Sequence, residues 1–109
     1  MPDENWVVVA SVHDVAENSA IAVTLGDFEL AVYHLEGGEF RCTDNICTHQ
    51  YARLTDGWLD GDVIECPLHA GQFDVRTGKG LCEPIERDLA VFELRVVDGT
   101  LLVRLPPGP

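Results

Sequence analysis

Basic residues are scarce in this chain, whose 109 residues include 7 lysines and arginines against 19 aspartates and glutamates. The formal net charge is therefore −12. Nucleic acids and anionic lipid surfaces both require a positive protein surface, so this composition argues against either as a partner. It favours basic proteins as partners, although acidity that serves only solubility remains an alternative explanation.

Long apolar stretches are missing as well. The longest uninterrupted apolar run is only a few residues, whereas a membrane-spanning helix needs about 20. The opening residues 1–5 have neither the positive charge nor the apolar stretch of a signal peptide. We therefore expect no membrane segment and a cytoplasmic location.

The sequence also lacks a long amphipathic helix pattern, an internal repeat and a low-complexity segment. Short β-branched and apolar runs alternate instead with turn residues, which is typical of antiparallel sheets. Ser11 is expected to cap at most a short helical turn, and the dipeptide Asp98-Gly99 predicts a type I′ hairpin turn. The strands that we expect are 6–10, 20–25, 28–35, 39–42, 58–59, 63–66, 72–75, 90–97 and 100–105.

The length of 109 residues fits one domain, spanning residues 1–109. Residues 43–86 are richer in Gly, Cys, His and Pro than the β segments on either side, and the expected strands are shorter there. The sequence thus predicts an all-β fold: an antiparallel β sandwich or small barrel that carries a loop-rich subdomain over about residues 43–86.

Two short runs hold the candidate metal ligands. Cys47-Thr48-His49 and Cys66-Pro67-Leu68-His69 each offer one thiolate and one imidazole, and sixteen residues separate His49 from Cys66. Such a set suits either a tetrahedral zinc ion or an iron–sulfur cluster. Because zinc sites usually present pairs of like ligands, one ligand of each kind per loop favours a two-iron cluster in which both sulfurs bind one iron and both nitrogens bind the other.

The other two histidines and the other two cysteines are not expected to bind the metal. His13 and His34 have no neighbouring cysteine and are read as surface or strand histidines. Cys42 and Cys82 are read as reduced thiols packed like small hydrophobic side chains. A disulfide or a redox-sensing pair formed by these two cysteines is the alternative.

The two runs, read together, resemble the signature of the Rieske family: C-x-H, about sixteen residues, then C-x2-H, here continued through residues 66–74 as CPLHAGQFD. The resemblance extends to Asp44-Asn45, Asp56-Gly57 and residues 78–84. Most of the chain is similar to the small Rieske ferredoxins of bacterial aromatic-ring-hydroxylating dioxygenase systems, especially those of the naphthalene and biphenyl type. This resemblance implies a Rieske fold and one [2Fe-2S] cluster, with Cys47 and Cys66 on the inner iron and His49 and His69 on the outer, redox-active iron.

The resemblance also implies a function. The protein would not be an enzyme itself but a soluble one-electron carrier. It would take electrons from a flavin-dependent NAD(P)H reductase and pass them to the terminal oxygenase of an aromatic-ring dioxygenase. We expect a monomer that docks transiently through the region of His49, His69, Leu68 and Pro84, with contributions from Gln50, Ala70 and the loop 79–84. The alternatives are a Rieske subunit of another redox complex such as nitrite reductase, a redox sensor and a structural zinc module. The sequence does not indicate which aromatic compound the system oxidises.

A low reduction potential is expected from the side chains near the predicted ligands. Respiratory relatives of the family carry an extra cysteine pair and Ser and Tyr hydroxyl donors, whereas the corresponding positions here resemble Ala52, Leu68, Gly71 and Phe73. Fewer donors to the cluster stabilise its reduced form less. We predict a potential toward the lower end of roughly −150 to +300 mV. Protein-film voltammetry checks this value, and a potential well above zero would contradict the reasoning.

Overall fold

The computed structural model describes residues 6–48, 52–68, 71–82, 85 and 87–105. This part of the chain contains strands and two short 3-10 turns but no α-helix. No helix within it is long and apolar enough to cross a membrane. In chain order the elements are β1 (Trp6–Ser11), η1 (Val12–Asp14), β2 (Ser19–Leu25), β3 (Phe28–His34), β4 (Phe40–Asp44), η2 (Leu54–Asp56), β5 (Trp58–Asp60), β6 (Val63–Glu65), β7 (Gln72–Asp74), β8 (Val91–Phe92), β9 (Leu94–Val97) and β10 (Thr100–Arg104).

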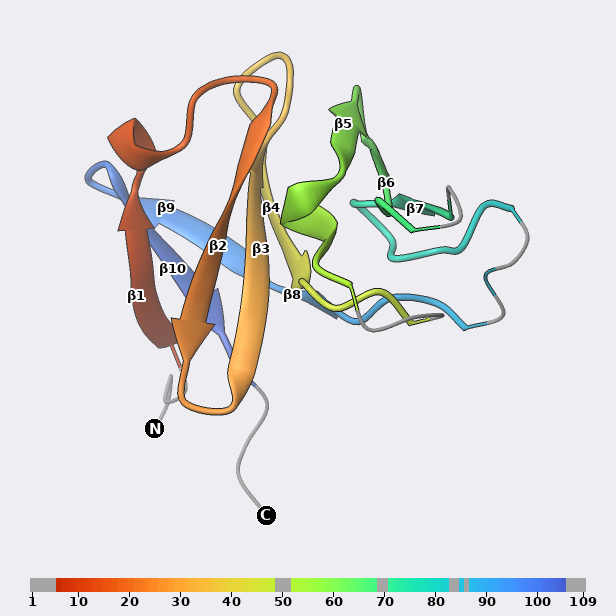
Figure 1. Cartoon of the computed structure of the whole chain (residues 1–109). Helices are drawn as coiled ribbons and strands as arrows, with labels where there is room; N and C mark the ends of the chain where they lie inside the picture. The colour runs from red at the N-terminus through yellow and green to blue at the C-terminus, as the bar shows by residue number, and fades with distance from the viewer. Residues whose placement is uncertain (1–5, 49–51, 69–70, 83–84, 86, 106–109) are drawn as a thin grey trace.

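The strands form three sheets, in the orders β1-β10-β9, β2-β3-β4-β8 and β5-β6-β7. Every pair of neighbouring strands is antiparallel. Figure 1 shows the first two sheets stacked on each other, with β9 and β10 behind β2 and β3; together they form the base of the molecule, and the short third sheet projects beyond β4. The prediction of an all-β antiparallel fold is confirmed.

Local sequence signals account for the connections that frame the base. Asp98 and Gly99 both have positive φ, 53° and 76°, as the central residues of a type I′ turn require. Ser11 caps η1 by accepting the His13 N–H at 3.2 Å, and the Asp14 carboxylate accepts the Ser11 N–H at 2.9 Å. This reciprocal capping box explains why the predicted short turn forms at this point.

The expected single strand 90–97 is wrong. It is two strands in different sheets: β8 pairs with β4, and β9 pairs with β10. The chain changes sheets at Glu93, whose carbonyl accepts the Arg104 N–H at 3.0 Å. Apolar patterning continues through this point, because both strands have an apolar face to bury, and so it did not indicate the change of partner.

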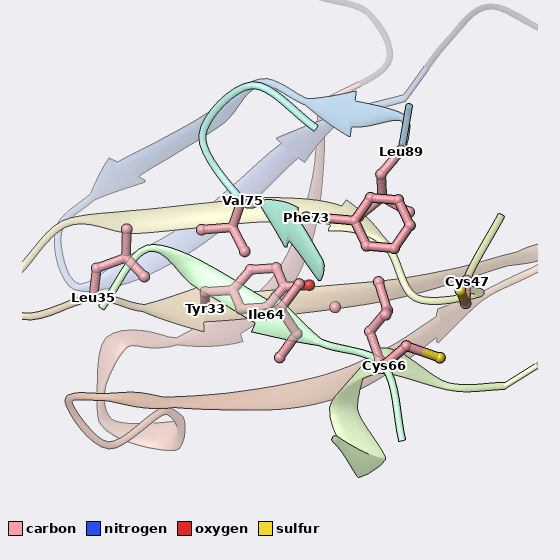
Figure 2. Packing of buried hydrophobic residues seen from close by; sticks show 10 residues of the cluster. Tyr33, Leu35, Cys47, Ile64, Cys66, Phe73, Val75 and Leu89 are labelled. Atoms are coloured by element: carbon pink, nitrogen blue, oxygen red, sulfur yellow. The ribbon is translucent and has the colours of Figure 1, made fainter. Parts of the chain in front are cut away.

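Strand β3 separates two hydrophobic cores. Leu30 and Val32 face the core between the first two sheets, and Ala31 and Tyr33 face a second core that reaches into the third sheet. Side chains on a strand alternate between its faces, so burial on both faces explains the unbroken apolar run of β3. Figure 2 shows the second core, which consists of Ala31, Tyr33, Leu35, Cys47, Leu54, Ile64, Cys66, Phe73, Val75 and Leu89.

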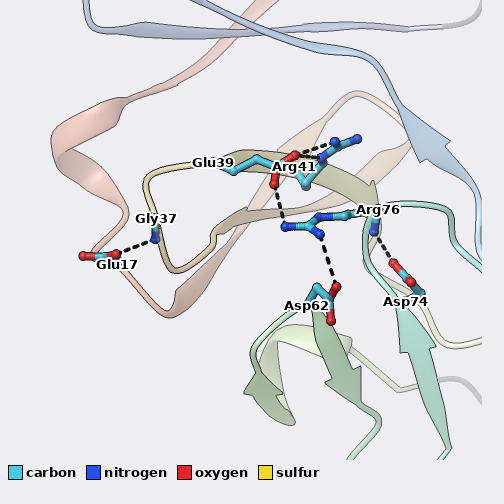
Figure 3. A network of polar contacts seen from close by, with 7 residues as sticks. All are labelled: Glu17, Gly37, Glu39, Arg41, Asp62, Asp74 and Arg76. Carbon is cyan, nitrogen blue, oxygen red and sulfur yellow. Dashed lines mark hydrogen bonds and ion pairs between the residues drawn. The ribbon is translucent and has the colours of Figure 1, made fainter.

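An ion-pair network joins the third sheet to the base (Figure 3). Arg76, just beyond β7, contacts Glu39 at 2.7 Å and Asp62 at 3.3 Å. Arg41 also pairs with Glu39, and its hydrogen bond is the main cause of the lowered pKa of that carboxyl. These side chains are partly exposed, so the network contributes modestly to stability and chiefly fixes the orientation of the two parts.

Gly57 provides a test of how closely the third sheet is packed. A Cβ at this position would lie 1.9 Å from the backbone oxygen of Glu65, which cannot move without disturbing β6. At Gly26, by contrast, φ is +57° but no atom lies within 4 Å. We expect Gly26→Ala to cost about 1–2 kcal/mol, the cost of the left-handed conformation, and Gly57→Ala to cost more. Denaturant unfolding measures both, and an equal or smaller loss for Gly57→Ala would contradict the close contact.

Candidate metal centre

The two predicted ligand loops have the same closing hydrogen bond. Cys47 lies beyond the end of β4, and its N–H donates to the Ala52 carbonyl at 2.9 Å. Cys66 follows β6, and its N–H donates to the Gly71 carbonyl at 2.7 Å. In both loops the cysteine therefore begins a turn that closes on the carbonyl five residues later. Each thiol is thus attached to backbone that is fixed by hydrogen bonding.

Both thiols are buried together. Cys47 is 4% exposed and Cys66 is 0% exposed, and both belong to the second core. Figure 2 shows them at one end of the second core, with Leu35 toward the other end. The structure thus brings together the two predicted cysteine ligands. His49 and His69 lie outside the described residues, so their part in the site stays a prediction.

The environment of Cys66 suits a metal-bound thiolate. Burial raises the pKa of its thiol to about 11, and the Leu68 N–H, which donates to Sγ at 3.4 Å, acts in the opposite direction. Metal binding removes the thiol proton, and an N–H donor aimed at the sulfur stabilises the resulting charge. The described residues contain no group of three or more His, Cys, Asp or Glu side chains able to hold a metal ion. The further ligands of a metal centre would have to come from outside that part, where the two predicted histidines lie.

A third segment, 78–89, contacts both ligand loops. Its ends are joined by a 2.6 Å hydrogen bond from the Leu89 N–H to the Gly78 carbonyl. Ile85 sits between the ligand-loop residue Gly71 and Gly80, because its methyl groups would lie 2.5 and 2.4 Å from a Cβ at these glycines. At the other loop, the Thr48 hydroxyl donates to the Arg87 carbonyl at 2.8 Å. The segment therefore braces the two loops that carry Cys47 and Cys66.

The surface near this end of the molecule includes exposed apolar side chains. Leu68 is 43% exposed and Leu81, in the predicted docking loop, is 44% exposed. Gln50, Ala70 and Pro84, also expected there, lie outside the described residues. Trp58 on β5 is 61% exposed, which sequence reasoning missed. Alternation along the expected strand 58–59 could have indicated it, because the two side chains face opposite ways and Leu59 packs against the second core.

The other two cysteines occupy different environments. Cys42 is packed in the first core, and burial raises the pKa of its thiol to about 12. Its interpretation as a small hydrophobic side chain is confirmed. The same interpretation is wrong for Cys82, which is exposed because it lies in the surface segment beyond Leu81. This difference in burial weighs against a disulfide between them.

The two histidines within the described residues, His13 and His34, lie on the surface or pack at the end of a strand. His13 is exposed on η1. His34, at the end of β3, is stacked on Phe40 with ring centroids 4.1 Å apart, and its Nδ1 lies 2.8 Å from the Val15 carbonyl oxygen. Both agree with the prediction of surface or strand histidines.

Comparison with known proteins identifies the class to which this fold and its paired thiols belong. A model of the Rieske [2Fe-2S] domain family matches residues 5–93, and the chain belongs to that family. It is 40% identical over 102 residues to the ferredoxin component of the naphthalene 1,2-dioxygenase/salicylate 5-hydroxylase systems of Ralstonia sp., covering 94% of this chain and 97% of that protein. Within the family it is thus a ferredoxin-type member that carries a [2Fe-2S] cluster and transfers electrons rather than acting as an enzyme.

Solved structures agree with this placement. The ferredoxin of Sphingomonas yanoikuyae B1 is 37% identical and superposes with a TM-score of 0.88, covering 94% of this chain and 100% of that one. A chain from the complex of reduced oxygenase and oxidised ferredoxin in carbazole 1,9a-dioxygenase is 40% identical, with a TM-score of 0.86 and 94% of each chain covered. The fold therefore matches that of Rieske ferredoxins over nearly its whole length.

The contact between Ile85 and Gly71 can be tested by a double-mutant cycle. Gly71→Ala would place a Cβ 2.5 Å from Cδ1 of Ile85, and such overpacking costs roughly 1–3 kcal/mol. Ile85→Ala removes both the obstruction and some packing. We expect the double variant to lose less thermal stability than the sum of the two single variants. The measurement is the temperature at which the visible absorbance of the cluster-loaded protein is lost, and additive losses would contradict the contact.

Proposed function

We propose that Cys47, His49, Cys66 and His69 hold the [2Fe-2S] cluster, with both cysteines on one iron and both histidines on the other. The observation that carries this proposal is the convergence of two buried thiols from separate loops, each loop having a histidine two or three residues further on. When bound, such a cluster accepts and releases one electron. The donor set fits, because thiolate sulfur and imidazole nitrogen are its known ligands.

The mixed ligand set determines the charge of the site. Two ferric ions and two sulfides carry two positive charges, which the thiolates of Cys47 and Cys66 cancel. Four thiolates would leave the oxidised site with two negative charges. The neutral His49 and His69 side chains therefore make addition of an electron easier than in an all-cysteine site.

The protein's role is to carry electrons to the terminal oxygenase of an aromatic-ring dioxygenase system, receiving them from a flavin-dependent reductase. The chain matches ferredoxin components of such systems over nearly their whole length, and this similarity supports the oxygenase as a partner. The net charge of −12 would speed encounter with basic partner surfaces.

Transient docking would use the apolar surface at the cluster end. Leu68 and Leu81 supply exposed apolar area, and Pro84 and the histidine ligands would lie beside them. A small interface lets a carrier dissociate quickly after transfer. Leu68 also has an alternative role, because an apolar side chain next to Cys66 would shield the cluster from water.

Ligation and function can be tested with four serine variants. Cys47→Ser and Cys66→Ser should abolish the EPR signal of the reduced cluster, because an alcohol replaces a thiolate ligand. Cys42→Ser and Cys82→Ser are the matched controls, and both should keep the signal. Mixed with NADH, a flavin reductase and a terminal oxygenase, the wild-type protein should support product formation and the first two variants should not. A colourless wild-type protein containing zinc, or a full signal from Cys66→Ser, would disprove the proposal.

A further inference from the structure

The two ligand loops share a closing hydrogen bond at the cysteine but differ in how far the strand pairing behind it extends. The loop of Cys66 lies between β6 and β7, and the pairing of Glu65 with Gln72 closes the ladder next to the cysteine. The loop of Cys47 starts at the end of β4, but its returning leg enters the 3-10 turn η2 rather than a strand. A single antiparallel bridge between Ile46 and Arg53 closes this loop next to Cys47, and because η2 follows Arg53 directly, the ladder does not continue as it does from β6 to β7.

The start of η2 also has backbone donors to satisfy. The first N–H groups of a helical turn have no acceptor within the turn, and a side chain at the N-cap normally accepts one of them. The N-cap residue is Arg53, whose side chain makes no such hydrogen bond. Its guanidinium is directed to Glu29, at 2.9 Å. The cap of this turn must therefore come from elsewhere in the chain.

Asn45 supplies it from the other leg of the loop. Its backbone carbonyl accepts the Leu54 N–H at 2.7 Å, and its side-chain Oδ1 accepts the Thr55 N–H at 2.9 Å. Its Nδ2 donates to the Thr55 hydroxyl at 3.0 Å. One residue thus joins the two legs of the loop by three hydrogen bonds.

Asn45 is itself held by a hydrogen bond to β3 and is buried. Its N–H donates to the Glu29 carbonyl on β3 at 2.8 Å, and the residue is only 1% exposed. Buried hydrogen bonds of this kind are costly to lose, because the groups left behind have no access to water. Cys47 is two residues further on, so loss of the Asn45 side-chain bonds would leave the backbone that carries its thiol held by the Ile46–Arg53 bridge with less support behind it.

We propose that Asn45 is the positioning residue of the first ligand loop: its side-chain amide supplements the single Ile46–Arg53 bridge, so that the backbone of Cys47 is held as firmly as that of Cys66 is held by the longer β6–β7 ladder. The inference rests on the proposed role of Cys47 as a cluster ligand. Loops held by hydrogen bonds on both sides would keep the sulfur positions constant while the charge of the site changes. Groups that bond a metal ligand directly typically affect metal affinity by roughly 10–100-fold, and Asn45, which acts through the loop backbone, is expected at the lower end of that range.

The test compares four variants of the cluster-loaded protein. Asn45→Ala removes the side-chain bonds to Thr55, Thr55→Val removes only the hydroxyl acceptor, and Thr55→Ser retains it. Val103→Ala, in the other core, is the control for general loss of stability, because Val103 is 0% exposed and belongs to the core that contains neither predicted ligand. The readouts are the EPR line shape of the reduced protein and the rate of cluster loss to an iron chelator, measured well below the unfolding temperature.

We expect Asn45→Ala to lose its cluster roughly tenfold faster than wild type and to shift or broaden the EPR lines. Thr55→Val should change both in the same direction by less, and Thr55→Ser should behave as wild type. Val103→Ala should lower the unfolding temperature with unchanged EPR lines.

Unchanged EPR lines and wild-type cluster retention in Asn45→Ala would overturn the proposal. If Asn45→Ala does not fold, equal behaviour of Thr55→Val and Thr55→Ser would overturn it instead. A wild-type protein without a Rieske EPR signal would refute the proposed cluster function as well, which separates failure of that function from failure of the Asn45 inference alone.

Discussion

Burial of β3 on both faces is the constraint on which the rest of the structure depends. Leu30 and Val32 pack into the core of the base, while Tyr33 packs into the core that also contains Cys47 and Cys66. The Tyr33 hydroxyl is satisfied by Thr43 at 2.9 Å, and burial raises its pKa well above the usual range, so it stays neutral. The candidate metal centre is therefore a continuation of the hydrophobic core, and the apolar packing that stabilises the fold also keeps water from the two thiols.

In the candidate centre the two thiols are buried, and the backbone that carries them is held by hydrogen bonds. Each cysteine N–H closes a turn on the carbonyl five residues later, and segment 78–89 braces both loops through Ile85 and Arg87. Sites held by rigid elements and by supporting hydrogen bonds keep their geometry better than sites on unsupported loops. In an electron carrier this restraint matters because the protein's task is to change charge without changing shape.

Much of this arrangement could be predicted from the sequence, because its signals are local. Alternating apolar residues indicated most strands, and Asp98-Gly99 and Ser11 indicated their turn and cap. The change of sheet at Glu93 could not be predicted in this way, because apolar alternation does not specify the partner strand. The sequence motif includes Asn45 but does not reveal its hydrogen bonds, because its partner Thr55 is ten residues away and the Leu54 and Thr55 donors depend on η2. Cys82 shows the same limit, since composition alone does not determine burial.

The shared strand β3 has a consequence for how the molecule unfolds. Neither core can open without exposing one face of β3, so the base and the metal-binding end are thermodynamically linked rather than independent folding units. The Arg76–Glu39 pair reinforces this link at the surface. A metal cluster bound at one end of the protein would therefore also stabilise the strands of the base. These strands would resist local opening although they do not contact the metal.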